Sequence, residues 1–122
     1  MGKRDHRLRS PEDFRRGLRQ RPVVRSGPVA LYKIDLDDGC RIGFVLPKKL
    51  IRSAVQRNQI KRWSRALFRD LLKRVPQGLL ASRPFGLIVR ITQPLEKQWP
   101  RTVLIDRVRV PLSGAFSQLA LT

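Results

Sequence analysis

Residues 28–36 are mostly apolar, and Lys33 and Asp35 alternate with apolar residues at the end of this stretch, which is typical of a strand with two faces. The next apolar stretch, residues 40–46, follows an Asp-Asp-Gly turn signal at residues 37–39. We therefore predict a hairpin of two paired strands, preceded by extended chain at residues 23–24. One face of the first strand carries Ala30, Tyr32, Ile34 and Leu36.

A helical spacing replaces this alternation over residues 54–74, which contain no Gly or Pro. Ser53 is the predicted N-cap, and Pro76 and Gly78 predict where the helix ends. With successive residues about 100° apart, apolar side chains form one stripe and cations lie largely opposite. The predicted stripe is Ile60, Trp63, Ala66, Leu67 and Leu71.

Two shorter elements are also predicted, a helix near the N-terminus and a further strand of the sheet. Ser10 is a suitable cap for a helix over residues 11–19, in which Phe14 and Leu18 share a face. Residues 85–91 are strongly apolar and rich in β-branched side chains, which predicts another strand.

The C-terminal part is harder to assign. Pro94 and Pro100 interrupt any long element, so residues 92–110 are expected to be irregular. Residues 111–121 have apolar positions at helical spacing, which predicts a short closing helix. Its expected inward side chains are Leu112, Ala115, Phe116 and Leu119.

The element order α-β-β-β-α-β-α predicts an α+β fold, a small two-layer sandwich with a four-stranded central sheet. The long helix connects the strand at residues 40–46 to the strand at residues 85–91, which is a β-α-β crossover. General chain physics favours a right-handed connection, because about 98% of such crossovers are right-handed.

The length of 122 residues and an apolar content of 41% predict a single domain spanning residues 1–122. No apolar run approaches a membrane span, and the charged N-terminus lacks a secretory signal, so we expect a cytoplasmic protein. Residues 1–9 are expected to be flexible. The net charge of +18 indicates a polyanionic partner.

The residues do not favour protein-based catalysis. The nine acidic residues are scattered, and Asp35, Asp37 and Asp38 gather where a turn is predicted. One histidine and one cysteine, His6 and Cys40, make a protein-built zinc site very unlikely. We predict no catalytic residue and no metal site in the chain.

The predicted basic helix face is the stronger functional signal. Arg57, Lys61 and Arg65 repeat at i, i+4 and i+8, so their side chains lie in a row about 6 Å apart along the axis. Such a row can neutralise successive phosphates, and Asn58 adds a neutral donor and acceptor. The alternative is a solvated helix face, although such faces normally mix charges of both signs.

Phe14 and Tyr32 are candidates for stacking on unpaired bases, since aromatic side chains beside cations serve that purpose. Each also has an ordinary structural explanation. Phe14 lies on the apolar face of a short helix, and Tyr32 shares its sheet face with core residues.

Residues 48–62, KKLIRSAVQRNQIKR, closely resemble the signature of the bacterial ribonuclease P protein subunit. That signature is a Lys-Lys pair followed by Ala-Val-x-Arg-Asn-Arg-x-Lys-Arg on a helix. The resemblance covers residues 7–91. It departs from the pattern at Gln59, where the family usually has Arg, and at Leu18, where a second cleft aromatic is frequent.

The resemblance implies a non-catalytic protein partner of a catalytic RNA. The holoenzyme, an endoribonuclease, uses Mg²⁺ held mainly by RNA to remove the 5′ leader of precursor tRNA. It further implies a 1:1 ribonucleoprotein with a monomeric protein, ribonuclease P RNA and precursor tRNA as partners, and a rare left-handed crossover. Phe14 and Tyr32 would line the leader cleft. The residues implied to face the catalytic RNA are Lys48, Lys49, Arg52, Arg57, Asn58, Lys61, Arg62 and Arg65.

Two other functions stay open on the residues alone. One is a structural RNA-binding protein, such as a ribosomal component, for which the Lys-Lys to Lys-Arg signature would be unnecessary. The other is a stand-alone nuclease, which the scattered carboxylates disfavour.

Overall fold

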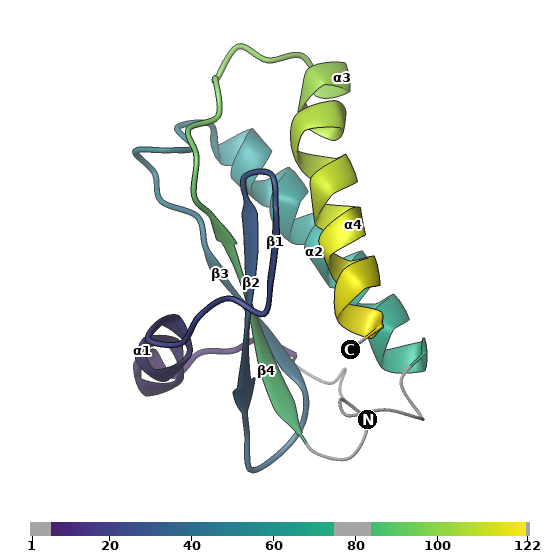
Figure 1. Ribbon diagram of the computed structural model, residues 1–122. Coiled ribbons are helices and arrows are strands. Elements are labelled where there is room, and N and C mark those ends of the chain that lie inside the picture. The colour runs from purple at the N-terminus through teal and green to yellow at the C-terminus, as the bar shows by residue number, and fades with distance from the viewer. Residues whose placement is uncertain (1–5, 75–83, 122) are drawn as a thin grey trace, which may run out of the picture.

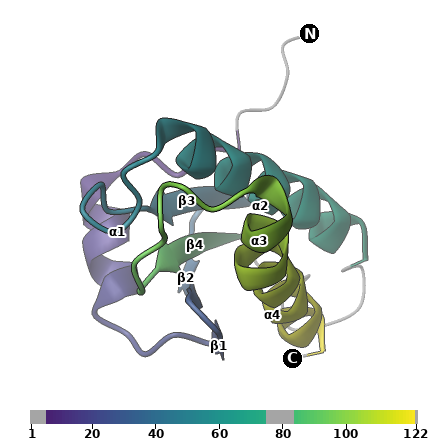
Figure 2. The same ribbon diagram turned by 90° about the horizontal axis from the view of Figure 1, so that it is seen from above.

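The computed structural model describes residues 6–74 and 84–121. A four-stranded sheet separates a short N-terminal helix from two longer helical segments (Figure 1). Seen from above, α1 lies on one side of the sheet, and α2 and α4 lie on the other (Figure 2). The predicted α+β class, element order and four-stranded sheet are confirmed, with α1 adding cover on the second face. The elements are α1 (Pro11–Leu18), β1 (Val24–Ser26), β2 (Val29–Asp35), β3 (Arg41–Val45), α2 (Ala54–Arg74), β4 (Phe85–Ile91), α3 (Arg101–Leu104), the π-helical turn η1 (Ile105–Arg109) and α4 (Val110–Ala120).

The strand order is β1-β2-β4-β3, so the predicted hairpin pairing of β2 with β3 is wrong. β4 lies between them, antiparallel to β2 with Tyr32 opposite Ile88 and parallel to β3 with Phe44 opposite Val89. The reason is burial, because six of the seven β4 residues are buried. A strand that is apolar on both faces is most stable in the centre of a sheet. The parallel β3–β4 pair confirms a β-α-β crossover through α2, whose handedness stays a prediction.

Two apolar clusters hold the layers together. The larger one lies between the sheet, α2 and the C-terminal helix, and it includes Phe68, Phe85 and Leu112. The smaller one lies under α1, where Phe14 and Leu18 pack on Tyr32 and Ile34. Each face of the sheet is therefore covered by helix, which buries apolar side chains of both faces.

The buried stripe of α2 differs in part from the predicted one. Ile60, Trp63 and Leu71 are buried as predicted, whereas Ala66 is exposed. Phe68 is buried instead, at 1% exposure. The stripe is shifted because α2 also faces α4 and η1, so packing on two neighbours selects the buried positions. Ser53 caps the helix as predicted, since its Oγ accepts a hydrogen bond from the Gln56 amide at 3.2 Å.

The C-terminal helix begins earlier than predicted. Residues 101–110 are helical rather than irregular, and Pro100 directly precedes the first turn. The π-helical turn η1 lies just before Pro111, whose ring lacks an N–H and cannot continue the regular hydrogen bonding. The inward positions of α4 are confirmed, with Leu112, Ala115, Phe116 and Leu119 all buried.

The N-terminal segment also differs from expectation. The prediction of a flexible segment over residues 1–9 is wrong for residues 6–8, which lie along β3, and its part on residues 1–5 lies outside the described residues. The Leu8 amide donates to the Ile42 carbonyl at 2.8 Å, and the Ile42 amide donates to the His6 carbonyl at 2.6 Å. Leu8 is 6% exposed, and its burial under α1 explains why this segment is held.

Gly114 provides a test of how α4 packs. It is exposed in α4, and a Cβ added there would meet only the Ser26 Oγ, at 3.9 Å. We expect Gly114→Ala to raise the free energy of unfolding by about 0.5–1 kcal/mol, because alanine is the better helix former. Urea unfolding measures this change. A lower stability would mean that α4 lies closer to β1 than the structure places it.

Candidate nucleic-acid interface

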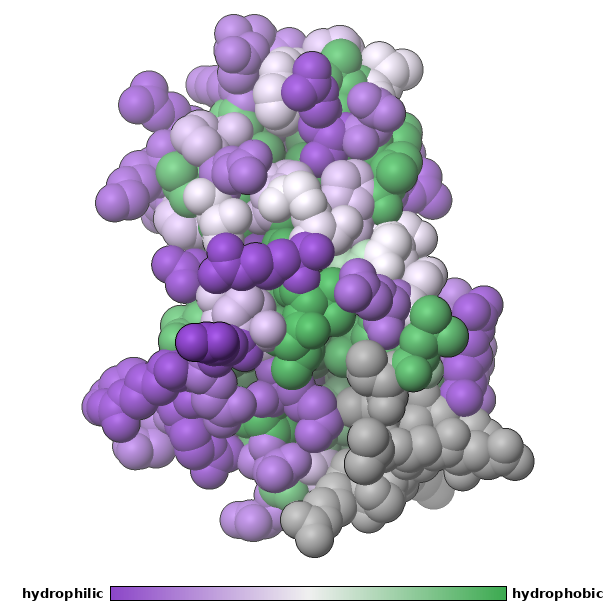
Figure 3. Space-filling model, viewed as in Figure 1, coloured by the Kyte–Doolittle hydropathy of each residue, from purple (hydrophilic) through white to green (hydrophobic). Residues whose placement is uncertain are grey.

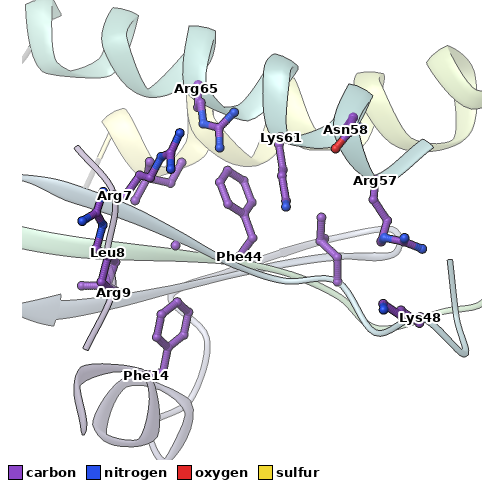
Figure 4. A pocket seen from close by; sticks show the side chains of 13 residues that line it. Arg7, Leu8, Arg9, Phe14, Phe44, Lys48, Arg57, Asn58, Lys61 and Arg65 are labelled. Atoms are coloured by element: carbon purple, nitrogen blue, oxygen red, sulfur yellow. The ribbon is translucent and has the colours of Figure 1, made fainter. Parts of the chain in front are cut away.

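A pocket of about 660 Å³ opens at the outer edge of β3, between α2, α1 and the N-terminal segment (Figure 4). β3 is an edge strand, and residues 6–8 pair with it at Ile42. The pocket therefore reaches around the edge of the sheet, with α2 on one side and α1 on the other. This arrangement brings together residues that are more than fifty positions apart in the sequence.

The described residues that line this pocket carry positive charge, and none of them is a carboxylate. α2 contributes Arg57, Lys61 and Arg65 in the predicted row, together with Asn58. In Figure 4 these side chains extend from α2 on the side of the helix that faces β3. Within residues 6–74 and 84–121, the ion pairs Arg16–Asp13 and Lys33–Asp35 lie at α1 and at the end of β2. The α2 cations thus keep their charge available for an external anion. The lining cations are Arg7, Arg9, Lys48, Arg57, Lys61 and Arg65.

The residues predicted to face RNA divide into two groups, and all of them except Asn58 are cations. Lys48, Arg57, Asn58, Lys61 and Arg65 line the pocket. Lys49, Arg52 and Arg62 are exposed and do not line it. These three side chains extend the positive charge beyond the pocket.

Arg57 is held in place by the chain that precedes α2. Its Nη1 donates to the Ile51 carbonyl oxygen at 2.6 Å, and Ile51 is fully buried. This bond uses one of the five guanidinium N–H donors and orients the others. Arg57 is therefore a preorganised cation, which loses less conformational entropy when it binds an anion than a free side chain would.

Aromatic rings lie on both sides of β3 within this pocket. Phe14 from α1 lies over Gly43, where a Cβ would approach the Phe14 ring to 2.5 Å. Phe44 lies on the α2 side, where the Arg65 Cζ is 5.5 Å from the ring centroid. Figure 4 shows the two rings on opposite sides of the strand.

Tyr32 does not line the pocket. It is 4% exposed, and its hydroxyl accepts a hydrogen bond from Arg90 Nη1 at 3.4 Å. It belongs to the same apolar cluster on which Phe14 packs. In this structure Tyr32 supports the Phe14 side of the sheet as a core residue.

Three important lining residues were missed from the sequence: Arg7, Arg9 and Phe44. The Arg-Leu-Arg alternation at residues 7–9 could have indicated a strand-like segment with outward cations. Phe44 follows the alternation of Ile42 and Leu46 on one face of β3, which predicts its direction but not its cationic neighbour.

The acidic residues that the structure describes do not form a catalytic or metal-binding group with the pocket. Asp35, Asp37 and Asp38 line a separate hollow beside the β2–β3 turn, together with Arg16 and Arg41. Among residues 6–74 and 84–121, no group of three or more His, Cys, Asp or Glu side chains could hold a metal ion. In the same ranges no helix is long and apolar enough to cross a membrane.

The face of the molecule that Figure 3 shows is largely polar. On the face seen in Figure 3, hydrophilic residues cover much of the area over α1, and hydrophobic residues show between them as smaller patches. The chain has 27 Lys and Arg residues against nine Asp and Glu residues. The pocket therefore lies within a broadly cationic surface.

Fold and site define a class of protein: a small basic α+β protein with an aromatic-containing cationic pocket at a sheet edge. The sequence model of the family described as Ribonuclease P matches residues 2–104. The chain therefore belongs to the Ribonuclease P family.

Similar proteins agree with this assignment. A Ribonuclease P protein component of Nitrosomonas europaea is 43% identical over 108 residues, covering 88% of this chain and 79% of the relative. A Ribonuclease P protein component of Ralstonia pickettii is 36% identical over 98 residues, covering 80% of this chain and 65% of the relative.

Two solved structures share the fold. The Staphylococcus aureus RNase P protein has a TM-score of 0.62 at 24% identity, covering 92% of this chain and 96% of that one. The Thermotoga maritima RNase P protein has a TM-score of 0.54 at 22% identity, covering 88% of this chain and 96% of that one.

Proposed function

We propose that this chain is the protein component of ribonuclease P. It binds the catalytic RNA and the 5′ leader of precursor tRNA, and it assists the Mg²⁺-dependent endonucleolytic removal of that leader. The observation that carries this proposal is the pocket beside α2, where six cations surround two phenylalanine rings and none of the described lining residues is a carboxylate. Membership of the family supplies the reaction, and the pocket supplies chemistry suited to RNA.

The α2 cations bind the phosphate backbone of the catalytic RNA. Arg57, Lys61 and Arg65 lie on successive turns, and the exposed Lys49, Arg52 and Arg62 lengthen the contact. Each neutralised phosphate releases counterions, so affinity falls steeply with salt. Asn58 can donate to or accept from a sugar or base edge beside this row.

Single-stranded leader binds on the Phe14 side of the pocket. Bases of an unpaired strand stack on aromatic rings, while Arg7 and Arg9 lie where its phosphates would pass. Leu18 lies in the core under α1 rather than in this pocket, so stacking on this side depends on Phe14. Tyr32 acts here by supporting Phe14.

The chemical step belongs to the RNA. The carboxylates of residues 6–74 and 84–121 form no metal-binding group, so the described part of the chain does not fit a protein-built Mg²⁺ site. The protein's contribution is electrostatic. Leader and catalytic RNA are both polyanions, and a cationic protein between them lowers the cost of bringing them together. We propose a cytoplasmic 1:1 ribonucleoprotein with one copy of the chain.

Reconstitution tests this function directly. The chain is combined with a bacterial ribonuclease P RNA and a precursor tRNA at low Mg²⁺, and 5′ cleavage is followed on a gel. We expect cleavage well above that of the RNA alone, because the protein supplies the charge neutralisation that Mg²⁺ otherwise provides.

The controls separate the alternatives. Unchanged cleavage in the presence of the protein would contradict the proposal and favour a structural RNA-binding role. The protein incubated with precursor alone is expected to leave it intact. Robust metal-dependent cutting in that control would favour a stand-alone nuclease.

A further inference from the structure

We propose that Phe44 and Arg65 form a stacking site for one unpaired nucleobase on the α2 side of β3. This inference rests on the proposed function, because it takes RNA as the ligand. It adds a second base-binding position to the pocket, separated from Phe14 by the thickness of the sheet.

The position of Phe44 makes its ring accessible. β3 is an edge strand, and the N-terminal segment pairs with it at Ile42, two residues before Phe44. Phe44 is only partly buried, at the margin of the larger apolar cluster. One part of its ring therefore packs on the core, and another part faces the pocket.

The guanidinium group of Arg65 lies over this ring, with Cζ 5.5 Å from the centroid. In the described part of the chain two other arginines lie over aromatic rings, Arg107 over Trp99 and Arg109 over Trp63, and neither pair lines this pocket. The Phe44–Arg65 pair thus differs from these two pairs because it lines the cationic pocket. Both a phenyl ring and a guanidinium group are platforms on which bases stack.

The neighbouring charges select a nucleotide rather than a neutral aromatic ligand. Lys61 and Arg57 precede Arg65 on the same face of α2 at intervals of about 6 Å, a spacing that suits successive phosphates of the strand that carries the stacked base. The pocket volume of about 660 Å³ falls within the range of ordinary ligand sites. A base at Phe44 would leave its phosphates among these cations.

Phe14 and Phe44 cannot stack on the same base. β3 separates the two rings, because Phe14 packs against Gly43 on the α1 face of this strand and Phe44 projects from the other face. Figure 4 shows Phe44 pointing toward α2 and Phe14 lying beyond the strand. The pocket therefore offers two stacking positions to two different nucleotides.

A comparison of two single-stranded probes tests this site on the full chain. One is a short oligoadenylate, and the other is the same backbone with abasic nucleotides. We expect Phe44→Leu to weaken oligoadenylate binding about fivefold to fiftyfold, because a stacked base is lost. The affinity for the abasic strand should stay within about twofold of the wild-type value. The slope of log affinity against log salt concentration should not change, because no phosphate contact is removed.

Trp99→Leu is the matched control, because it also removes an aromatic ring from under an arginine, Arg107, outside the pocket. It should leave both affinities within about twofold. Arg65→Lys is the second variant, since it keeps the charge but removes the planar group. It should reduce the preference for bases and retain abasic binding even if Phe44→Leu fails to fold.

Equal losses for both probes, or no loss for either, would overturn the site. The cleavage assay described above distinguishes this failure from a failure of the proposed function. If the wild-type chain enhances cleavage while Phe44→Leu and Arg65→Lys both keep the full preference for bases, the stacking site is wrong and the proposed function stands.

Discussion

Replacing Arg57 by alanine is expected to weaken binding to ribonuclease P RNA about tenfold to a hundredfold, the range for a charged hydrogen bond. Arg57 lines the cationic pocket, and its bond of 2.6 Å to the Ile51 carbonyl already orients it. The logarithm of affinity should also depend less steeply on salt, by about 0.9 for one lost phosphate contact. A filter-binding titration at several salt concentrations measures both quantities.

Arg101→Ala is the control for charge alone. Arg101 is exposed at the start of α3 and does not line the pocket. Its loss should reduce affinity by much less than the loss of Arg57. Equal effects of the two substitutions would mean that the positive charge acts diffusely. Thermal unfolding of both variants checks that loss of the Ile51 bond has not unfolded the start of α2.

Gly43→Ala is expected to lower the free energy of unfolding by about 1–3 kcal/mol, the usual cost of overpacking. An added Cβ would lie 2.5 Å from the Phe14 Cζ and 3.0 Å from the Leu8 Cβ. The direction is informative, because alanine in a strand interior is otherwise more favourable than glycine. Phe14 would be displaced from β3, so affinity for a single-stranded leader should fall as well. Urea unfolding and leader binding measure the two effects.

The double variant Gly43→Ala with Phe14→Leu tests whether the loss of stability comes from the clash with the Phe14 ring. A smaller side chain at position 14 relieves the clash, so stability should recover in part. Leader affinity should stay low, because the stacking ring is still absent. If Gly43→Ala alone were as stable as the wild-type chain, close packing of Phe14 on β3 would be contradicted.

Much of the local structure was predictable because it depends on neighbours in sequence. The spacing of apolar residues and the Ser53 cap predicted α2 with its observed bounds, Ala54–Arg74. The row of cations on that helix follows from the helical repeat alone. β4 and the inward positions of α4 were likewise readable from composition and period.

The errors share a physical cause. A turn signal at residues 37–39 predicted that β2 and β3 would pair, but a turn does not exclude a third strand from the space between them. Pro94 and Pro100 predicted an irregular segment over residues 92–110, yet Pro100 directly precedes a helix that begins at Arg101. In each case contacts distant in sequence decided between conformations that the local residues permit.

By itself the sequence determined the α+β class, the basic helix with its apolar back, and the resemblance in residues 48–62 that the family comparison confirms. The tertiary structure decided which side chains share the pocket. It placed Arg7, Arg9 and Phe44 beside the α2 cations and turned Tyr32 into the core. The reason is that helix and strand periods arise between near neighbours, whereas the pocket is formed by the burial of β4 and the pairing of residues 6–8 with β3.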